Sequence, residues 1–198
     1  MNFLIVFAKI PILERTDKIR GKVGNMKRTF FAFLLLLASF AAGAKSFSLQ
    51  VIQRNTGGDS VFDTSYVVEQ AIMDYFFEHG MIISSNQVIV SKRDDASEKK
   101  ELRRSLIEAK TGCMDLFVKL CLNFALEDSM NPSAVLLSNI NDAELEILST
   151  ETTETVATGK YSPKVVPNKN DNRGGVESFA TDISAYIHTR LSKKGGAK

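Results

Sequence analysis

Histidine is the side chain that most often binds metals or transfers protons near neutral pH, and the chain has two, His79 and His188. Each lies near the C-terminal end of a predicted helix, without a cysteine, an aspartate or a second histidine at metal-ligand spacing in the sequence. A histidine at such a position is favourably placed against the negative end of the helix dipole. The pattern therefore predicts two structural histidines and no zinc site.

Two pairs of adjacent carboxylates, Asp94-Asp95 and Glu127-Asp128, have the oxygen ligands that a hard cation prefers. Neither pair lies in an EF-hand spacing, and acidic residues at the boundaries of elements more often act as caps. We therefore expect no metal ligand at either pair.

A glycine-rich segment, Gly57-Gly58-Asp59, lies between a predicted strand and a predicted helix, where phosphate-binding loops occur. It has neither a Walker lysine nor the G-x-G-x-x-G spacing, and we interpret it as a flexible loop. A Gly-x-Ser-x-Gly nucleophile elbow is also missing from the sequence. The sequence thus predicts no catalytic, cofactor-binding or metal-binding residue. It favours a protein without enzymatic activity but does not decide the question.

The two cysteines, Cys113 and Cys121, lie eight residues apart around a predicted strand. At about 3.3 Å per residue, an extended chain would separate them by about 26 Å. A disulfide needs Cα atoms within about 7 Å. We expect small buried thiols, with pairing between molecules through Cys113 as the alternative.

Phe77 is an aromatic residue that a simple solvated helix face does not explain. It lies half a turn around its predicted helix from Val68, opposite the apolar stripe. Single exposed aromatics are common, so one interpretation is burial under a neighbouring loop. The other is an anchor for a partner protein, because aromatic residues are enriched at the centres of interfaces.

The spacing of apolar residues predicts the elements that position these side chains. Alternation is clearest over residues 116–126, and further strands are predicted at residues 46–54, 81–91, 140–148 and 155–161. Apolar residues at helical spacing predict three helices, at residues 65–80, 95–112 and 176–191. The order β-α-β-α-β-β-β-α predicts the α+β class, as a two-layer sandwich. It would have a mixed sheet of about five strands and three helices packed on one face.

Residues 26–44 have the three parts of a secretory signal peptide. Lys27-Arg28 is the positive region, residues 30–42 are apolar, and small residues precede the predicted cleavage between Ala44 and Lys45. A membrane anchor is the alternative. The uncharged stretch has only 16 residues, whereas a spanning helix needs about 20. We therefore expect no stable transmembrane helix after processing.

The segment before Met26 is unusually long for a signal peptide, and we interpret residues 1–25 as a misassigned start or an extension. A single domain is predicted at residues 45–192 and a flexible tail at residues 193–198.

The whole chain has 25 basic and 23 acidic residues, of which residues 1–44 hold seven and two. The mature part would have a net charge of −3, which does not favour nucleic-acid binding.

The order of elements resembles the periplasmic α+β domains of the CsgG, TolB N-terminal and LpoB kind. The similarity is carried by the helix ending at Tyr75-Phe76-Phe77, the strands at 81–90 and 116–126, the hairpin ending at Thr158-Gly159-Lys160, and the last helix. Relatives of CsgG and LpoB are typically lipoproteins with a cysteine at the cleavage site. Here that position is Lys45, which does not support a lipid anchor.

The resemblance implies a scaffold or protein-binding module of the cell envelope. Its partner would be another envelope protein or a second copy of the chain. We therefore expect an exported, periplasmic or secreted protein without catalytic activity. The alternative is a hydrolase or small-ligand binder whose site is formed by the loops at residues 57–63 and 164–173.

Overall fold

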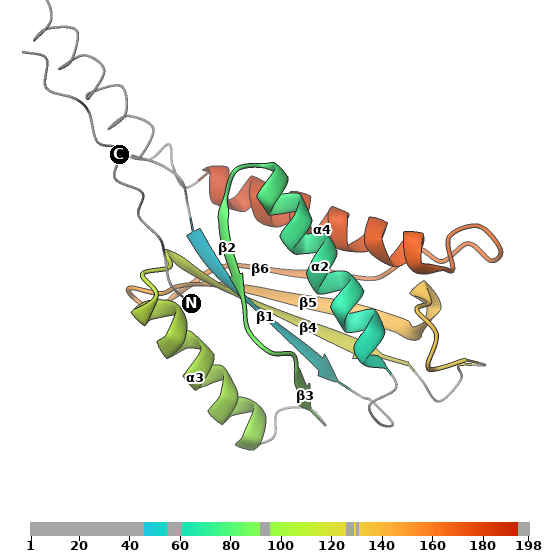
Figure 1. The fold of residues 1–198 in the computed structure, drawn as a ribbon, viewed down its shortest axis with the longest axis horizontal. Helices are drawn as coiled ribbons and strands as arrows, with labels where there is room; N and C mark the ends of the chain where they lie inside the picture. The colour runs from blue at the N-terminus through green and yellow to red at the C-terminus, as the bar shows by residue number, and fades with distance from the viewer. Residues whose placement is uncertain (1–45, 55–60, 92–95, 126–128, 130, 194–198) are drawn as a thin grey trace, which may run out of the picture. The chain divides into compact units, whose positions relative to one another are not determined.

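The computed structural model of the chain describes residues 46–54, 61–91, 96–125, 129 and 131–193. Over these residues the chain forms one mixed sheet of six strands and three α-helices (Figure 1). The strands are β1 (Ser46–Arg54), β2 (Ile82–Ser85), β3 (Ile89–Ser91), β4 (Leu116–Phe124), β5 (Ile140–Ser149) and β6 (Thr155–Tyr161). The helices are α2 (Phe62–Glu78), α3 (Ala96–Thr111) and α4 (Arg173–Lys193).

The strand order is β2-β1-β4-β5-β6, and β3 also pairs with β1. β1 is parallel to β2, β3 and β4, whereas β4 to β6 form an antiparallel meander. The predicted strand at residues 81–91 is in fact two short strands, β2 and β3, along one side of β1. They extend the expected five strands to six.

One face of the sheet carries the main hydrophobic core, beneath α2 and α4 (Figure 1). Alternate residues of β1 contribute Phe47, Leu49 and Val51, all fully buried. The ring of Phe47 meets that of Phe76 in α2 edge to face, with centroids 4.7 Å apart. This face is the expected result of period-two strands packed against an apolar helix stripe.

The other face of β1 is covered by α3. Ser105 Oγ in α3 donates to Gln50 Oε1 over 2.7 Å, and Gln50 is fully buried. The sequence analysis expected helices on one face, but only α2 and α4 share a face, and all nine residues of β1 are buried. The face of β1 toward α3 carries polar residues, because α3 contacts the sheet through hydrogen bonds as well as apolar contacts.

Backbone hydrogen bonds define how α2 ends. After α2, Met81 N–H donates to Phe76 O and Gly80 N–H donates to Phe77 O, both over 3.0 Å, with Gly80 at φ +69°. This is a Schellman motif, in which glycine adopts the left-handed conformation without strain. The motif holds the backbone of the last turn of α2 in place.

The α+β class, the three helices, the mixed sheet and the order of elements are confirmed. Among the described residues, no helix is both long enough and apolar enough to span a bilayer. The signal peptide at residues 26–44 and the extension at residues 1–25 lie outside the described residues. Of the predicted tail, only Lys193 is described, as the last residue of α4.

Candidate functional site

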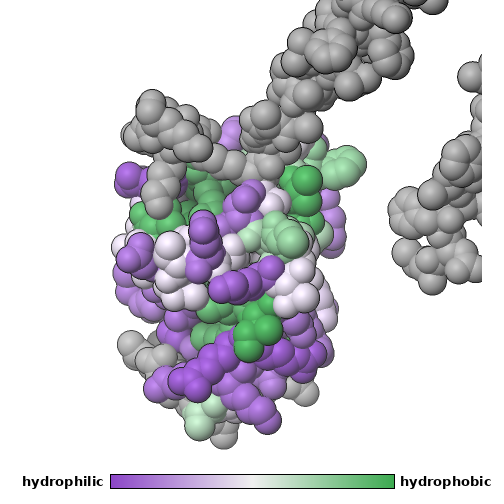
Figure 2. All heavy atoms as spheres, turned by 90° about the vertical axis from the view of Figure 1, so that its left-hand side faces the viewer, coloured by the Kyte–Doolittle hydropathy of each residue, from purple (hydrophilic) through white to green (hydrophobic). Residues whose placement is uncertain are grey.

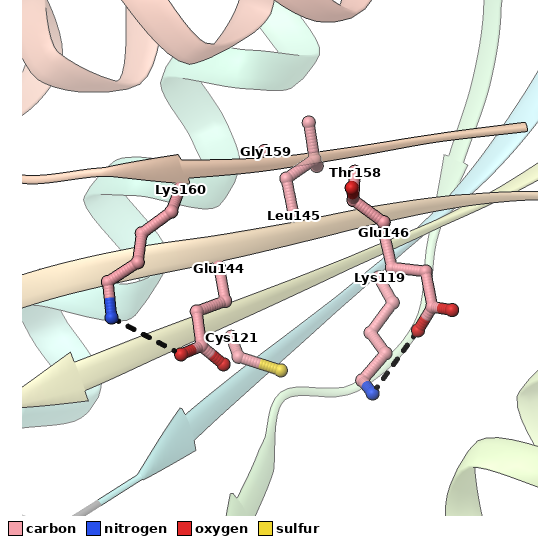
Figure 3. Close-up of a pocket in the computed structure, with 8 residues that line it drawn as sticks. All are labelled: Lys119, Cys121, Glu144, Leu145, Glu146, Thr158, Gly159 and Lys160. Atoms are coloured by element: carbon pink, nitrogen blue, oxygen red, sulfur yellow. Dashed lines mark hydrogen bonds and ion pairs between the residues drawn. The ribbon is translucent and has the colours of Figure 1, made fainter. Parts of the chain in front are cut away.

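The part of the second sheet face over β4 to β6 forms an open cavity of about 500 Å³. Its charged lining residues are Lys119, Glu144, Glu146 and Lys160, from all three strands. Figure 3 shows Lys119 pointing toward Glu146 and Lys160 toward Glu144, with the Cys121 thiol between the two pairs. The alternation of the strands places these side chains on one face.

These charges are paired across the strands. Lys119 Nζ lies 3.5 Å from Glu146 Oε2, and Lys160 Nζ lies 3.5 Å from Glu144 Oε1. Lys160 Nζ also lies 3.4 Å from Asp142 Oδ2. Because opposite charges alternate, the surface suits a polar partner with charges of both signs better than a ligand with a large net charge.

The thiol in this cavity is unreactive at neutral pH. Burial raises the pKa of Cys121 to about 11, although the nearby charges of Arg54 and Lys119 oppose this shift. A thiol with this pKa stays protonated and is a poor nucleophile. Cys113, the other free cysteine, is exposed at the end of α3 with φ +56°, so the expectation of buried thiols holds only for Cys121.

A buried ion pair joins this face to α3. Arg54 Nη2 donates to Glu98 Oε1 over 2.5 Å, and Ser91 Oγ donates to Glu98 Oε2 over 2.5 Å. Arg54 Nη1 also lies 3.7 Å from Glu144 Oε2, at the edge of the cavity. Residue spacing does not reveal this pair, because its partners come from separate elements and follow no motif.

Phe77 is 80% exposed at the C-terminal end of α2, so the described residues do not bury it. The Schellman motif that follows holds this end of the helix in place. Figure 2 views the molecule from the left-hand side of Figure 1, the side toward which α2 runs, and shows separate hydrophobic areas among hydrophilic residues. Phe77 is thus a solvent-exposed aromatic side chain on a helix end whose backbone is held by hydrogen bonds.

The loop at residues 162–172 lines a second cavity, of about 470 Å³, at the N-terminal end of α4. Two lysines, Lys164 and Lys169, contribute to it, together with Gly174 and Gly175. This is half of the loop-built site that the sequence suggested as an alternative. The other half is the segment 57–63, of which residues 57–60 lie outside the described residues and residues 61–63 lie at the start of α2.

The two histidines are far apart in the sequence. In the fold they lie side by side near the ends of α2 and α4. Their ring centroids are 5.0 Å apart. No group of three or more histidine, cysteine, aspartate or glutamate residues that could hold a metal occurs in the described part of the chain. The carboxylates at 94–95 and 127–128 lie outside that part.

A family model described as "Uncharacterised protein" matches residues 46–192, from the first strand to the last helix. The chain belongs to this family. No curated protein matches the sequence.

Solved structures similar to the chain include lipoprotein GNA1162 from Neisseria meningitidis, at 8% identity and a TM-score of 0.41 over 73% of this chain and 99% of that one. The PelC dodecamer from Paraburkholderia phytofirmans has 13% identity and a TM-score of 0.39, over 75% and 87% of the two chains. Protein XCC0632 from Xanthomonas campestris, of the DUF330 family model, has 11% identity and a TM-score of 0.38, over 78% and 90%. Because these TM-scores are below 0.5, we argue function from the residues of this chain alone.

Proposed function

We propose that the chain is an exported envelope protein that binds another protein through the C-terminal end of α2. The observation that carries this proposal is the 80% exposure of Phe77 on a helix end that backbone hydrogen bonds hold in place. The signal-peptide pattern of residues 26–44 supports export.

Burial of Phe77 in a partner would contribute a large part of the binding free energy. Complete burial of a phenylalanine side chain would stabilise the complex by about 1.5–3 kcal/mol. Because the Schellman motif already orders the backbone, less conformational entropy is lost on binding. These are the properties of an interface hot spot.

The open cavity over β4 to β6 favours binding over covalent catalysis. The Cys121 thiol is protonated at neutral pH, and the ammonium groups of Lys119 and Lys160 are paired with carboxylates. Paired surface charges can exchange partners with a docking protein, which favours specific recognition.

Photo-crosslinking in intact cells tests the proposal directly. A photoreactive amino acid at position 77 should give a discrete adduct in the envelope fraction. The same amino acid in place of Ile107, which is 65% exposed on α3, should not. Mass spectrometry of the adduct separates another envelope protein from a second copy of the chain. Identical adducts at both positions, or none at position 77, would contradict the proposal.

Substitution provides the matching loss of function. Phe77→Asp should abolish the complex with the crosslinked partner, because a carboxylate cannot enter an apolar pocket without a large desolvation cost. Ile107→Asp is the matched control and should retain it. Both variants should unfold at the wild-type temperature, and unfolding of Phe77→Asp would show that the residue is structural.

A second candidate function is the binding of a small anionic ligand in the cavity at the N-terminal end of α4. The observation that favours it is the position of Lys164 and Lys169 around the first turn of this helix. The positive end of the helix dipole also attracts anions at such a position.

A further inference from the structure

The only two histidines of the chain meet where α2 and α4 end on the same side of the molecule (Figure 1). The planes of the two imidazoles are inclined at 73°, and their centroids are 5.0 Å apart. Tyr75 contacts both rings. Its ring stacks on His79 with centroids 4.1 Å apart, and its Oη lies 3.4 Å from His188 Nδ1.

The separation of the two rings suits one shared metal ion. A zinc–imidazole bond is about 2.0–2.1 Å long, so a bound ion lies about 3.2 Å from the ring centroid. Two imidazoles on one tetrahedral ion would then have centroids about 5.2 Å apart. The observed 5.0 Å agrees with this value.

The tautomer of His79 also suits a metal ligand. Its Nδ1 lies 2.6 Å from the backbone oxygen of Tyr75. A carbonyl oxygen can only accept a hydrogen bond, so Nδ1 carries a proton and a metal ion would bind through Nε2. Histidines that bind metals usually donate their other ring nitrogen to such a carbonyl, which fixes the ring and raises its basicity.

We propose that His79 and His188 together bind one divalent transition-metal ion of the Zn²⁺, Ni²⁺ or Cu²⁺ class. Imidazole nitrogen suits these ions, and solvent would occupy the remaining coordination positions. His79 is exposed, so the ion has direct access from solvent. The site would link the ends of α2 and α4, and the argument for it does not rest on the protein-binding role of Phe77.

Calorimetric titration of the purified chain with ZnCl₂ tests this site. The experiment uses a Cys113→Ser background, because Cys113 is an exposed thiol that can itself bind zinc. We expect one Zn²⁺ per chain. His79→Gln and His188→Gln should each weaken binding at least about tenfold, and the double variant should be little worse than either, because one ion needs both rings.

The thermal stability of the same variants provides a second readout. Saturating Zn²⁺ should raise the melting temperature of the parent protein, since an ion that binds only the folded state stabilises it. Neither histidine variant should respond, although both should match the parent in the presence of EDTA. Glu177→Gln, which removes an exposed carboxylate from α4, should behave like the parent. No zinc binding by the parent, or equal zinc affinity in the histidine variants, would overturn the proposal.

Discussion

Glu98 is a charged residue that the fold buries almost completely, at 1% exposure. Desolvation raises its pKa, but hydrogen bonds from Arg54 and Ser91 and the charge of Arg54 outweigh it and hold the pKa below the ordinary 4.5. A carboxyl with a lowered pKa contributes stability that is present above its ordinary pKa. That stability is lost as the pH falls below 4.5 toward the pKa of the folded state.

Glu98→Gln should therefore destabilise the domain by about 3 kcal/mol at pH 7, because the buried guanidinium of Arg54 loses the carboxylate charge that lies 2.5 Å from it. The matched control is Glu101→Gln, a partly exposed residue of the same helix paired with Arg104, which should change stability by less than about 1 kcal/mol. Urea unfolding at pH 7 and pH 4 measures both effects. Glu98→Gln should also lose less stability than the wild-type protein between pH 7 and pH 4. Equal effects of the two substitutions would contradict this account of the ion pair.

Among the elements, the start of α4 shows how a loop and a helix constrain each other. Asn172 Oδ1 accepts the backbone N–H of Gly175 over 3.1 Å and so caps the first turn. A Cβ added at Gly175 would lie 1.7 Å from the backbone oxygen of Asn170. The loop that lines the second cavity can therefore approach the helix only because residue 175 has no side chain.

Gly175→Ala should destabilise the protein by about 1–3 kcal/mol, because either the loop or the helix must move. Gly174→Ala is the matched control, since a Cβ there would lie 3.3 Å from the side-chain oxygen of Asn172, which can adjust. Thermal unfolding of the two variants checks the prediction. A similar loss in both would show that helix flexibility, rather than the close approach to Asn170, explains the effect.

For the whole molecule, the hydrophobic core lies within the domain that the family model matches. Its residues run from Phe47 in β1 to Leu191 in α4. Every residue of this core therefore lies after the predicted cleavage between Ala44 and Lys45. A chain without residues 26–44 would retain every one of these core contacts.

The mature protein should accordingly begin at Lys45, immediately before β1. Intact-mass analysis of the protein recovered from the cell envelope measures this start. Ala44→Arg should block processing, because signal peptidase requires a small residue before the cleaved bond. Lys45→Arg, on the other side of that bond, is the control and should be processed normally. Recovery of the unprocessed wild-type chain would favour a membrane anchor.

Much of the fold could be predicted because strand and helix periods are local properties of the chain. Alternation over residues 116–126 predicted β4, which ends at Phe124, and the apolar stripe ending before Gly80 predicted α2. The position of α3 could not be predicted in this way. Residue spacing within β1 does not show that Gln50 is fully buried and accepts a hydrogen bond from Ser105 of α3.

By itself, the sequence determined the α+β class, the order of the elements and the unusual position of Phe77, because each follows from residue spacing within one segment. Only the tertiary structure decided that Phe77 stays exposed and that the charges over β4 to β6 are paired. It also brought His79 beside His188. Those facts depend on contacts between distant segments, and residue spacing along the chain does not record such contacts.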